Sequence, residues 1–376
     1  MRRMQSIVSR SQCQRDSVAW IVSTFQFVDV GCSVTAALLG KLIVMACCLG
    51  TSLSGACRRT RRSPSGETAR QALITNLPGE LPELEKRIND GLGQLLPRAF
   101  FKRPRRLAVD LHLRPYYGQR QRTPVRGGKR KAGTKWFWTW ATVAVVDRGQ
   151  RWTIALTHVK PGDKLEDVLA RLLDRVEGAQ IPVKMVLVDR EFYAANVIAL
   201  LQSRQIPFLM PAIRRGQLDG SRGPTGTQRF FQAGMQGFFE HQWTARGKSN
   251  RQRVNVQIAC VPRKADDRRK TPLVFAFDGL SSRPLLWYRE TYRKRFGIET
   301  SYRQLGQGLG QTTSKSPAWR MMLVGVALLM RNLWVWRNQQ IRPRSITLSE
   351  QLHQLNVYVS HDLDLILDFE ITGVIT

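Results

Sequence analysis

The chain has 376 residues, 43% of them apolar, which is enough for a large core in two or three domains and excludes a small disulfide-stapled scaffold. Lysine and arginine outnumber aspartate and glutamate by 59 to 28, and the formal net charge of +31 favours a polyanionic partner, above all nucleic acid. The length and the ten tryptophans argue against a ribosomal-type basic protein.

The cysteines and one apolar run indicate the compartment. The six cysteines form no Cys-x-x-Cys pair, so we expect neither a zinc site nor a disulfide framework, but reduced thiols in the cytoplasm, near the nucleoid. The apolar run at 30–50 contains Lys41, and a charge near the middle of a span opposes membrane insertion. We expect a buried helix there and no membrane partner; a membrane-associated protein is the competing hypothesis.

Residues 1–100 are predicted to form a helical domain that binds DNA. Ser65 can cap a helix that ends near Leu77, because a serine side chain satisfies free amides at a helix start. A helix, a turn with glycine and a second helix beside an arginine cluster are typical of a helix-turn-helix, here at about 55–80. An ordinary helical hairpin with a solvated basic face fits equally well. The cluster consists of Arg58, Arg59, Arg61 and Arg62.

From residue 101 the pattern changes to strands and helices. Strands are predicted at 106–113, 136–146, 152–159, 183–188 and 206–210, with a hairpin turn at 147–150 and helices at 163–176 and 191–204. A three-stranded meander followed by helix, strand, helix and strand is the element order of a ribonuclease-H-like core, an α/β fold with a mixed sheet. Residues 101–210 would be the first part of that core.

A basic loop is predicted at 114–135. Asp110 is the one acidic residue between Lys102 and Lys131, where lysine and arginine are dense. We expect the loop, which includes Lys129, Arg130 and Lys131, to clamp the DNA backbone; a merely solvated loop is the alternative.

The remaining residues, 211–376, are predicted to interrupt and then complete the core. Residues 211–282 hold strand-like pieces at 230–243, 253–261 and 273–277 and are predicted to be a β-rich insertion. Helices are predicted at 288–305 and 318–337, so the core would resume over 283–340. A short helix at 348–358 and a tail would form 341–376.

Three acidic residues occupy positions suited to metal binding. Asp110 follows Leu-Ala-Val, Asp189 follows Val-Leu-Val, and Glu299 lies in the predicted helix at 288–305. A carboxylate at the end of a buried strand is costly unless a cation meets it. In the predicted core the three would converge and could hold two Mg²⁺ or Mn²⁺ ions, which suits phosphodiester chemistry. Taken singly, each aspartate could be a turn or helix cap.

The segments around these residues resemble DDE transposases of prokaryotic insertion sequences, in the insertion-sequence-four-like superfamily with a Tyr-Arg-Glu-Lys signature. Tyr292, Arg295 and Glu299 match its Tyr-x2-Arg-x3-Glu spacing. The run Asp189–Phe192 is similar to its Asp-Arg-Gly-Tyr/Phe element, and a β-rich insertion is a further family feature. The signature lysine would fall at Gly306.

The resemblance implies an enzyme that cuts DNA at the inverted-repeat ends of its element and joins the freed 3′ ends to target DNA. Asp110, Asp189 and Glu299 would be both catalytic residues and ligands of two Mg²⁺ or Mn²⁺ ions. Tyr292 and Arg295 would contact the terminal phosphate. Two further cations were weighed for DNA contact: Arg190 beside Asp189, and Arg303, which lies one helical turn after Glu299.

Other roles follow from the same resemblance. Residues 55–75 would recognise the ends, a homodimer would act on paired ends, and a tryptophan such as Trp243 or Trp287 could stack on a flipped base. Gly306 in place of the lysine keeps a second hypothesis open. In it the chain is a catalytically impaired, transposase-like DNA-binding protein that acts as a repressor.

Overall fold

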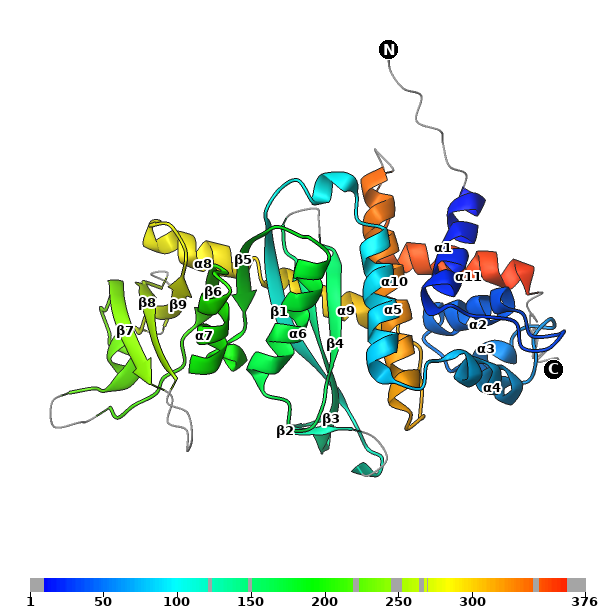
Figure 1. Cartoon of the computed structure of the whole chain (residues 1–376), viewed down its shortest axis with the longest axis horizontal. Coiled ribbons are helices and arrows are strands. Elements are labelled where there is room, and N and C mark those ends of the chain that lie inside the picture. Colours follow the sequence, from blue (N-terminus) through cyan, green and yellow to red (C-terminus); the bar gives the residue numbers. More distant parts are fainter. Residues whose placement is uncertain are drawn as a thin grey trace, which may run out of the picture. The chain divides into compact units, whose positions relative to one another are not determined.

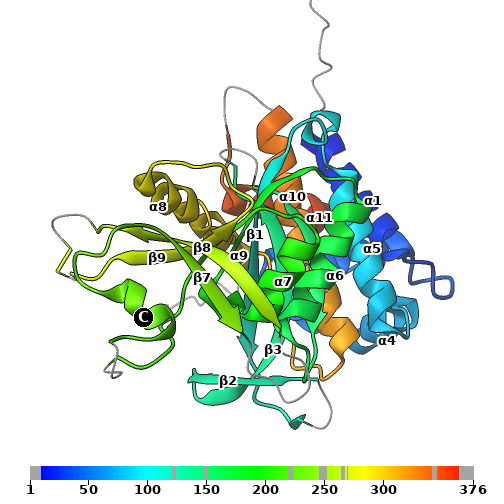
Figure 2. The ribbon, with the colours of Figure 1, turned by 60° about the vertical axis from the view of Figure 1, so that its left-hand side comes forward.

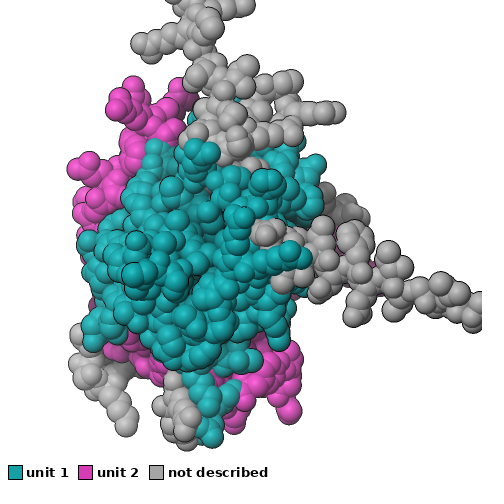
Figure 3. Space-filling view, turned by 90° about the vertical axis from the view of Figure 1, so that its right-hand side faces the viewer, with its two compact units in different colours: residues 1–96, 118–123, 302–376 teal, residues 97–117, 124–301 magenta. Residues whose placement is uncertain are grey.

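The structure is a computed structural model that describes residues 10–120, 124–147, 151–218, 223–244, 252–263, 267–268, 270–340 and 345–363. Most of the turn expected at 147–150 and part of the expected C-terminal tail lie outside these residues. The chain forms two compact units, coloured separately in Figure 3. One comprises Met1–Leu96, Gly118–Thr123 and Tyr302–Thr376, and the other Pro97–Tyr117 and Pro124–Ser301.

The second unit is built on a nine-stranded mixed sheet (Figure 1). The strands are β1 (Arg105–Pro115), β2 (Arg126–Lys131), β3 (Thr134–Val145), β4 (Thr153–Val159), β5 (Val183–Val188), β6 (Phe208–Pro211), β7 (Gly237–Thr244), β8 (Arg253–Val261) and β9 (Leu273–Asp278).

Five of these strands confirm the ribonuclease-H-like prediction. β1 pairs antiparallel with β3 and β3 antiparallel with β4, while β5 pairs parallel with β1 and with β6. Helices α6 (Leu165–Gly178) and α7 (Ala195–Ser203) join β4 to β5 and β5 to β6. β1 thus lies inside the sheet, with its apolar residues 107–109 fully buried. This arrangement puts the end of β5 beside the middle of β1.

The β-rich insertion continues the same sheet. β9 pairs antiparallel with β6, β8 with β9 and β7 with β8, and Figure 2 shows these three strands side by side. The strand predicted at 230–243 begins only at Gly237, because a 3-10 helix, η4 (Gly226–Phe231), precedes it. Helix α8 (Leu285–Arg293) packs on this part of the sheet, with the Tyr288 ring 4.6 Å from that of Phe277.

Two sequence-based predictions in this unit are wrong in detail. The loop predicted at 114–135 contains strand β2, which forms a hairpin with β3 through Ala132 and Gly133. Both turn residues have positive φ angles, 49° and 80°, as a two-residue hairpin turn requires. The helix predicted at 288–305 is two helices, α8 and α9 (Phe296–Gln307), separated at Lys294 and Arg295.

The first unit is helical over the residues that the structure describes, while residues 97–100, which the sequence-based boundary placed in the N-terminal domain, belong to the other unit. The helices of the first unit are α1 (Arg10–Phe25), α2 (Ala36–Cys48), α3 (Leu53–Cys57), α4 (Gly66–Asn76), α5 (Leu81–Gln94), α10 (Pro317–Gln340) and α11 (Leu348–Asp362). The apolar run at 30–50 contains the buried helix α2, and Lys41 forms an ion pair with Asp362 at 2.7 Å. Ser65 caps α4 as expected, since its hydroxyl accepts from the Thr68 amide at 3.0 Å.

Helix α10 groups with the N-terminal helices, whereas the sequence-based boundaries placed it in the core segment 283–340. It packs against α1, α2, α5 and α11 and is apolar on nearly every side. By length and composition α10 could cross a membrane, but 83% of its most apolar window is buried inside the protein. A helix buried in that way fits a core element.

The expected helix-turn-helix region contains α3 and α4. The arginine cluster lies at the end of α3 and in the connection to α4, with all four side chains exposed. In the usual motif the second helix reads the DNA groove, but the one arginine of α4, Arg70, forms an ion pair with Glu67. The exposed connection therefore carries the basic charge of this region.

Candidate active site

Asp110 and Asp189 lie at neighbouring positions of two paired strands. Val109 of β1 and Val188 of β5 are partners in the parallel ladder; Asp110 is the next residue of β1, and Asp189 is the first residue after β5. The apolar residues before each aspartate are buried in the sheet. Pairing in this register places both carboxylates at the same edge of the buried core.

Each aspartate also satisfies a local amide. Asp110 accepts a hydrogen bond from the Leu111 amide at 3.0 Å. Asp189 accepts one from the Arg190 amide at 2.7 Å and so caps η3 (Arg190–Phe192). The capping role weighed for a lone aspartate is thus present at Asp189, whereas Asp110 lies within β1 and caps no helix.

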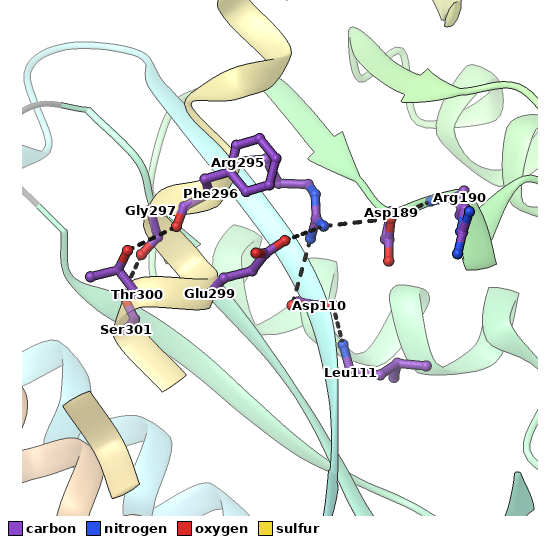
Figure 4. A network of polar contacts seen from close by, with 10 residues as sticks. All are labelled: Asp110, Leu111, Asp189, Arg190, Arg295, Phe296, Gly297, Glu299, Thr300 and Ser301. Carbon is purple, nitrogen blue, oxygen red and sulfur yellow. Dashed lines mark hydrogen bonds and ion pairs between the residues drawn. The ribbon is translucent and has the colours of Figure 1, made fainter. Parts of the chain in front are cut away.

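Arg295 brings the three acidic residues together (Figure 4). Its guanidinium lies 3.5 Å from a carboxylate oxygen of Asp110, 3.5 Å from one of Asp189 and 2.9 Å from one of Glu299. The Arg295 side chain is only 7% exposed, whereas that of Glu299, in the first turn of α9, is 42% exposed. The predicted convergence of the three carboxylates is therefore present in the structure.

The cluster of Arg295 and the three acidic residues contains more negative than positive groups. Three carboxylates surround one guanidinium, and burial raises the pKa of Asp110 to about 6, with Arg295 lowering it and Asp189 raising it further. Burial lowers the pKa of Arg295, but Tyr292 and the three carboxylates outweigh that effect, so its pKa is raised. A buried site with surplus negative charge favours an added cation.

The donor chemistry fits Mg²⁺ or Mn²⁺, since carboxylate oxygens are the ligands these ions prefer. Within the described ranges, however, no group of three or more His, Cys, Asp or Glu side chains is arranged to hold a metal ion. The reason is visible in Figure 4, where the guanidinium lies between the carboxylates. Metal binding by these residues would require Arg295 to move.

Besides Arg295, three residues around the carboxylates were predicted to contact DNA: Tyr292, Arg190 and Arg303. Tyr292 is near, because the Arg295 guanidinium lies 5.7 Å from the centre of its ring. Arg190 is exposed and lies on the far side of Asp189 from Arg295 (Figure 4). Arg303 is exposed on the part of α9 that belongs to the other compact unit.

Gly306 and the three basic residues of β2 are exposed to solvent. A Cβ atom added at Gly306 would meet no atom within 4 Å, so a side chain fits there. Lys129, Arg130 and Lys131 are all exposed on β2.

Trp243, one of the two tryptophans considered for base stacking, belongs to a stack whose other members, Tyr193 and Arg215, were missed by sequence reasoning. The rings of Tyr193 and Trp243 lie 5.0 Å apart and nearly parallel, and the Arg215 guanidinium lies 4.6 Å from the Trp243 ring. Arg215 also donates to the Tyr193 carbonyl at 2.9 Å. Trp287 instead packs edge-on against Tyr288. Tyr193 follows Asp189 by only four residues, and this short separation in the sequence could have indicated that Tyr193 lies close to the site.

Comparison with known proteins gives a structural likeness only. No family model and no curated protein matches the chain. A solved structure that does match is the synaptic complex of piggyBac transposase with hairpin DNA, at a TM-score of 0.54 and 9% identity. The match covers 97% of this chain and 84% of the other. At that identity the likeness shows the fold, which is the ribonuclease-H-like fold of a transposase.

Proposed function

We propose that the chain is a DDE-type transposase that cuts and joins DNA at the ends of an insertion sequence. The observation that carries the proposal is the convergence of Asp110, Asp189 and Glu299, from β1, β5 and α9, on one edge of a transposase-type sheet. DNA as the partner is supported by the net charge of +31 and by the DNA in the similar transposase complex.

In the proposed reaction the three carboxylates would hold two Mg²⁺ or Mn²⁺ ions. When bound, such ions activate the attacking oxygen and neutralise charge on the phosphate. Water attacks the phosphorus at the end of the element, and the bond to the 3′ oxygen breaks. The freed 3′ hydroxyl then attacks a phosphodiester of the target and displaces a second 3′ oxygen. The protein contributes placement and a partly buried, acidic site.

The cations around the site would position the DNA. Tyr292 and Arg295 would contact the terminal phosphate, because an arginine fork matches phosphate oxygens. Arg190 and Arg303 would contact the backbone further away. The exposed cluster Arg58, Arg59, Arg61 and Arg62 would bind the element's ends, with two copies of the chain acting on paired ends beside the nucleoid.

The β2–β3 hairpin would hold the DNA backbone. Replacing Lys129, Arg130 and Lys131 together with glutamine is expected to weaken duplex binding for any sequence and to reduce the slope of log affinity against log salt by about 2–3. The measurement is fluorescence anisotropy across a salt series. The control is Arg204→Gln with Lys160→Gln and Lys184→Gln, an equal loss of charge outside the β2–β3 hairpin, after α7, after β4 and in β5. An unchanged slope in the hairpin variant would contradict this role.

The test of the proposed function is a strand-cleavage assay. The full chain is incubated with a supercoiled plasmid that carries both ends of its element, with Mg²⁺, with Mn²⁺ or with a chelator. We expect metal-dependent nicks at the element's 3′ ends. Specific binding to those ends without nicking under either metal would instead support the repressor hypothesis.

A further inference from the structure

Arg295 occupies the position where a metal ion would be expected. It is almost fully buried, it contacts all three carboxylates, and it is the residue on which they converge. Two cations cannot share that space without strong repulsion in a poorly screened site. Metal ions and the Arg295 guanidinium therefore compete for the same ligands.

We propose that Arg295 is a place-holding cation that keeps metal ions out until DNA is bound. This inference rests on the proposed function and adds an order of binding to it. In the free protein the guanidinium neutralises the carboxylates. When a phosphate arrives, Arg295 transfers to it and vacates the site for divalent ions.

The contacts of Arg295 are suited to such a transfer. Two of its three ion pairs are 3.5 Å long, and its Nη1 atom makes no hydrogen bond despite being buried. A phosphate group offers shorter bonds to both nitrogens of the fork. The guanidinium would thus exchange two ion pairs of 3.5 Å, together with its 2.9 Å hydrogen bond to Glu299, for a two-pronged contact with phosphate.

The backbone around Arg295 also permits movement. The residue lies in the break between α8 and α9, where several amides bond three residues back: Arg295 to the Tyr292 carbonyl at 2.9 Å and Gly297 to that of Lys294 at 3.0 Å. Glu299 follows by one helical turn and is 42% exposed. A small shift of the backbone at this break would move the Arg295 guanidinium away from Asp110 and Asp189.

Metal binding in the absence of DNA tests the inference. Binding of Mn²⁺ to the full chain is followed by electron paramagnetic resonance of the free ion. Arg295→Gln is expected to bind Mn²⁺ at least about tenfold more tightly than the unmodified chain. The matched control is Arg171→Gln, which removes an arginine paired with Asp163 at 2.6 Å and is expected to leave Mn²⁺ binding unchanged.

Two failures can be told apart. The unmodified chain could bind Mn²⁺ as tightly as Arg295→Gln does, with Asp110→Asn abolishing that binding. This result would contradict the place-holding role of Arg295 and would support the metal site. If neither protein binds Mn²⁺ in a way that depends on Asp110, the proposed metal chemistry itself fails. Should Arg295→Gln not fold, the unmodified chain is titrated with Mn²⁺ with and without a duplex of its element's end. The same titration of Asp110→Asn gives the Mn²⁺ held by the DNA, which is subtracted. If the duplex then causes no increase in Mn²⁺ binding by the protein, the place-holding role of Arg295 is wrong.

Discussion

Replacing Asp110 with asparagine is expected to abolish strand cleavage without weakening the fold. Loss of groups that merely orient a metal ligand costs 10–100-fold in activity, so loss of a proposed ligand should lower the cleavage rate by at least about 100-fold. Cleavage of the end-bearing plasmid under Mg²⁺ measures this effect. Retained cleavage in the folded variant would contradict the assignment of Asp110.

The same Asp110→Asn substitution is expected to leave the stability of the fold unchanged or to raise it, although it abolishes cleavage. Because the pKa of Asp110 is raised from 3.8 to about 6 in the folded protein, keeping it ionised costs folding free energy that grows between about pH 4 and pH 6. At pH 7.5 the asparagine variant should be as stable as the unmodified chain or more so, by up to about 3 kcal/mol. Thermal melts without divalent ions measure the difference. The control is Asp147→Asn, which loses an ion pair with Arg106 and should be less stable.

Replacing Trp140 with alanine is expected to cost about 3–5 kcal/mol of unfolding free energy. Its side chain is fully buried on β3, with its ring 4.3 Å from His112 and 5.0 Å from Trp138. Trp140 and His112 are partners in the β1–β3 ladder, two residues beyond Asp110. The cavity would therefore open directly beside the strand that carries the first carboxylate.

Denaturant unfolding monitored by circular dichroism measures the cost of Trp140→Ala. The matched control is Trp136→Ala, a half-buried tryptophan on the same strand, for which a clearly smaller loss is expected. Equal losses for the two variants would mean that burial of Trp140 does not support β1 as described.

The positions of Asp110, in the middle of β1, and Asp189, directly after β5, could be predicted from sequence because a fully apolar run precedes each of them. The element order then placed β5 next to β1, and the observed partnership of Val109 with Val188 follows from that order. Glu299 could be added from its spacing to Tyr292 and Arg295. Local pattern and order of elements were sufficient for the two aspartates, whereas Glu299 depended on the spacing of the family signature that the segment resembles.

The location of Arg295 could not be predicted, because helical spacing relates it to Glu299 but gives no information on its contacts across the sheet. The break at Lys294 and Arg295 has no proline or other local marker. Strand β2 was missed for another reason: two glycines and four cations have little strand preference, and pairing with β3 decides their conformation. Helix α10 is apolar on nearly all sides, so no polar face indicated which helices it would join.

Metal binding by the three carboxylates can be seen directly by diffraction from crystals grown with Mn²⁺ and a duplex of the element's end, with data collected at the manganese absorption edge. We expect anomalous peaks within bonding distance of Asp110, Asp189 and Glu299, with Arg295 turned from the carboxylates to a phosphate. Bound DNA with the guanidinium still between the three carboxylates, and no anomalous peak beside them, would contradict this expectation.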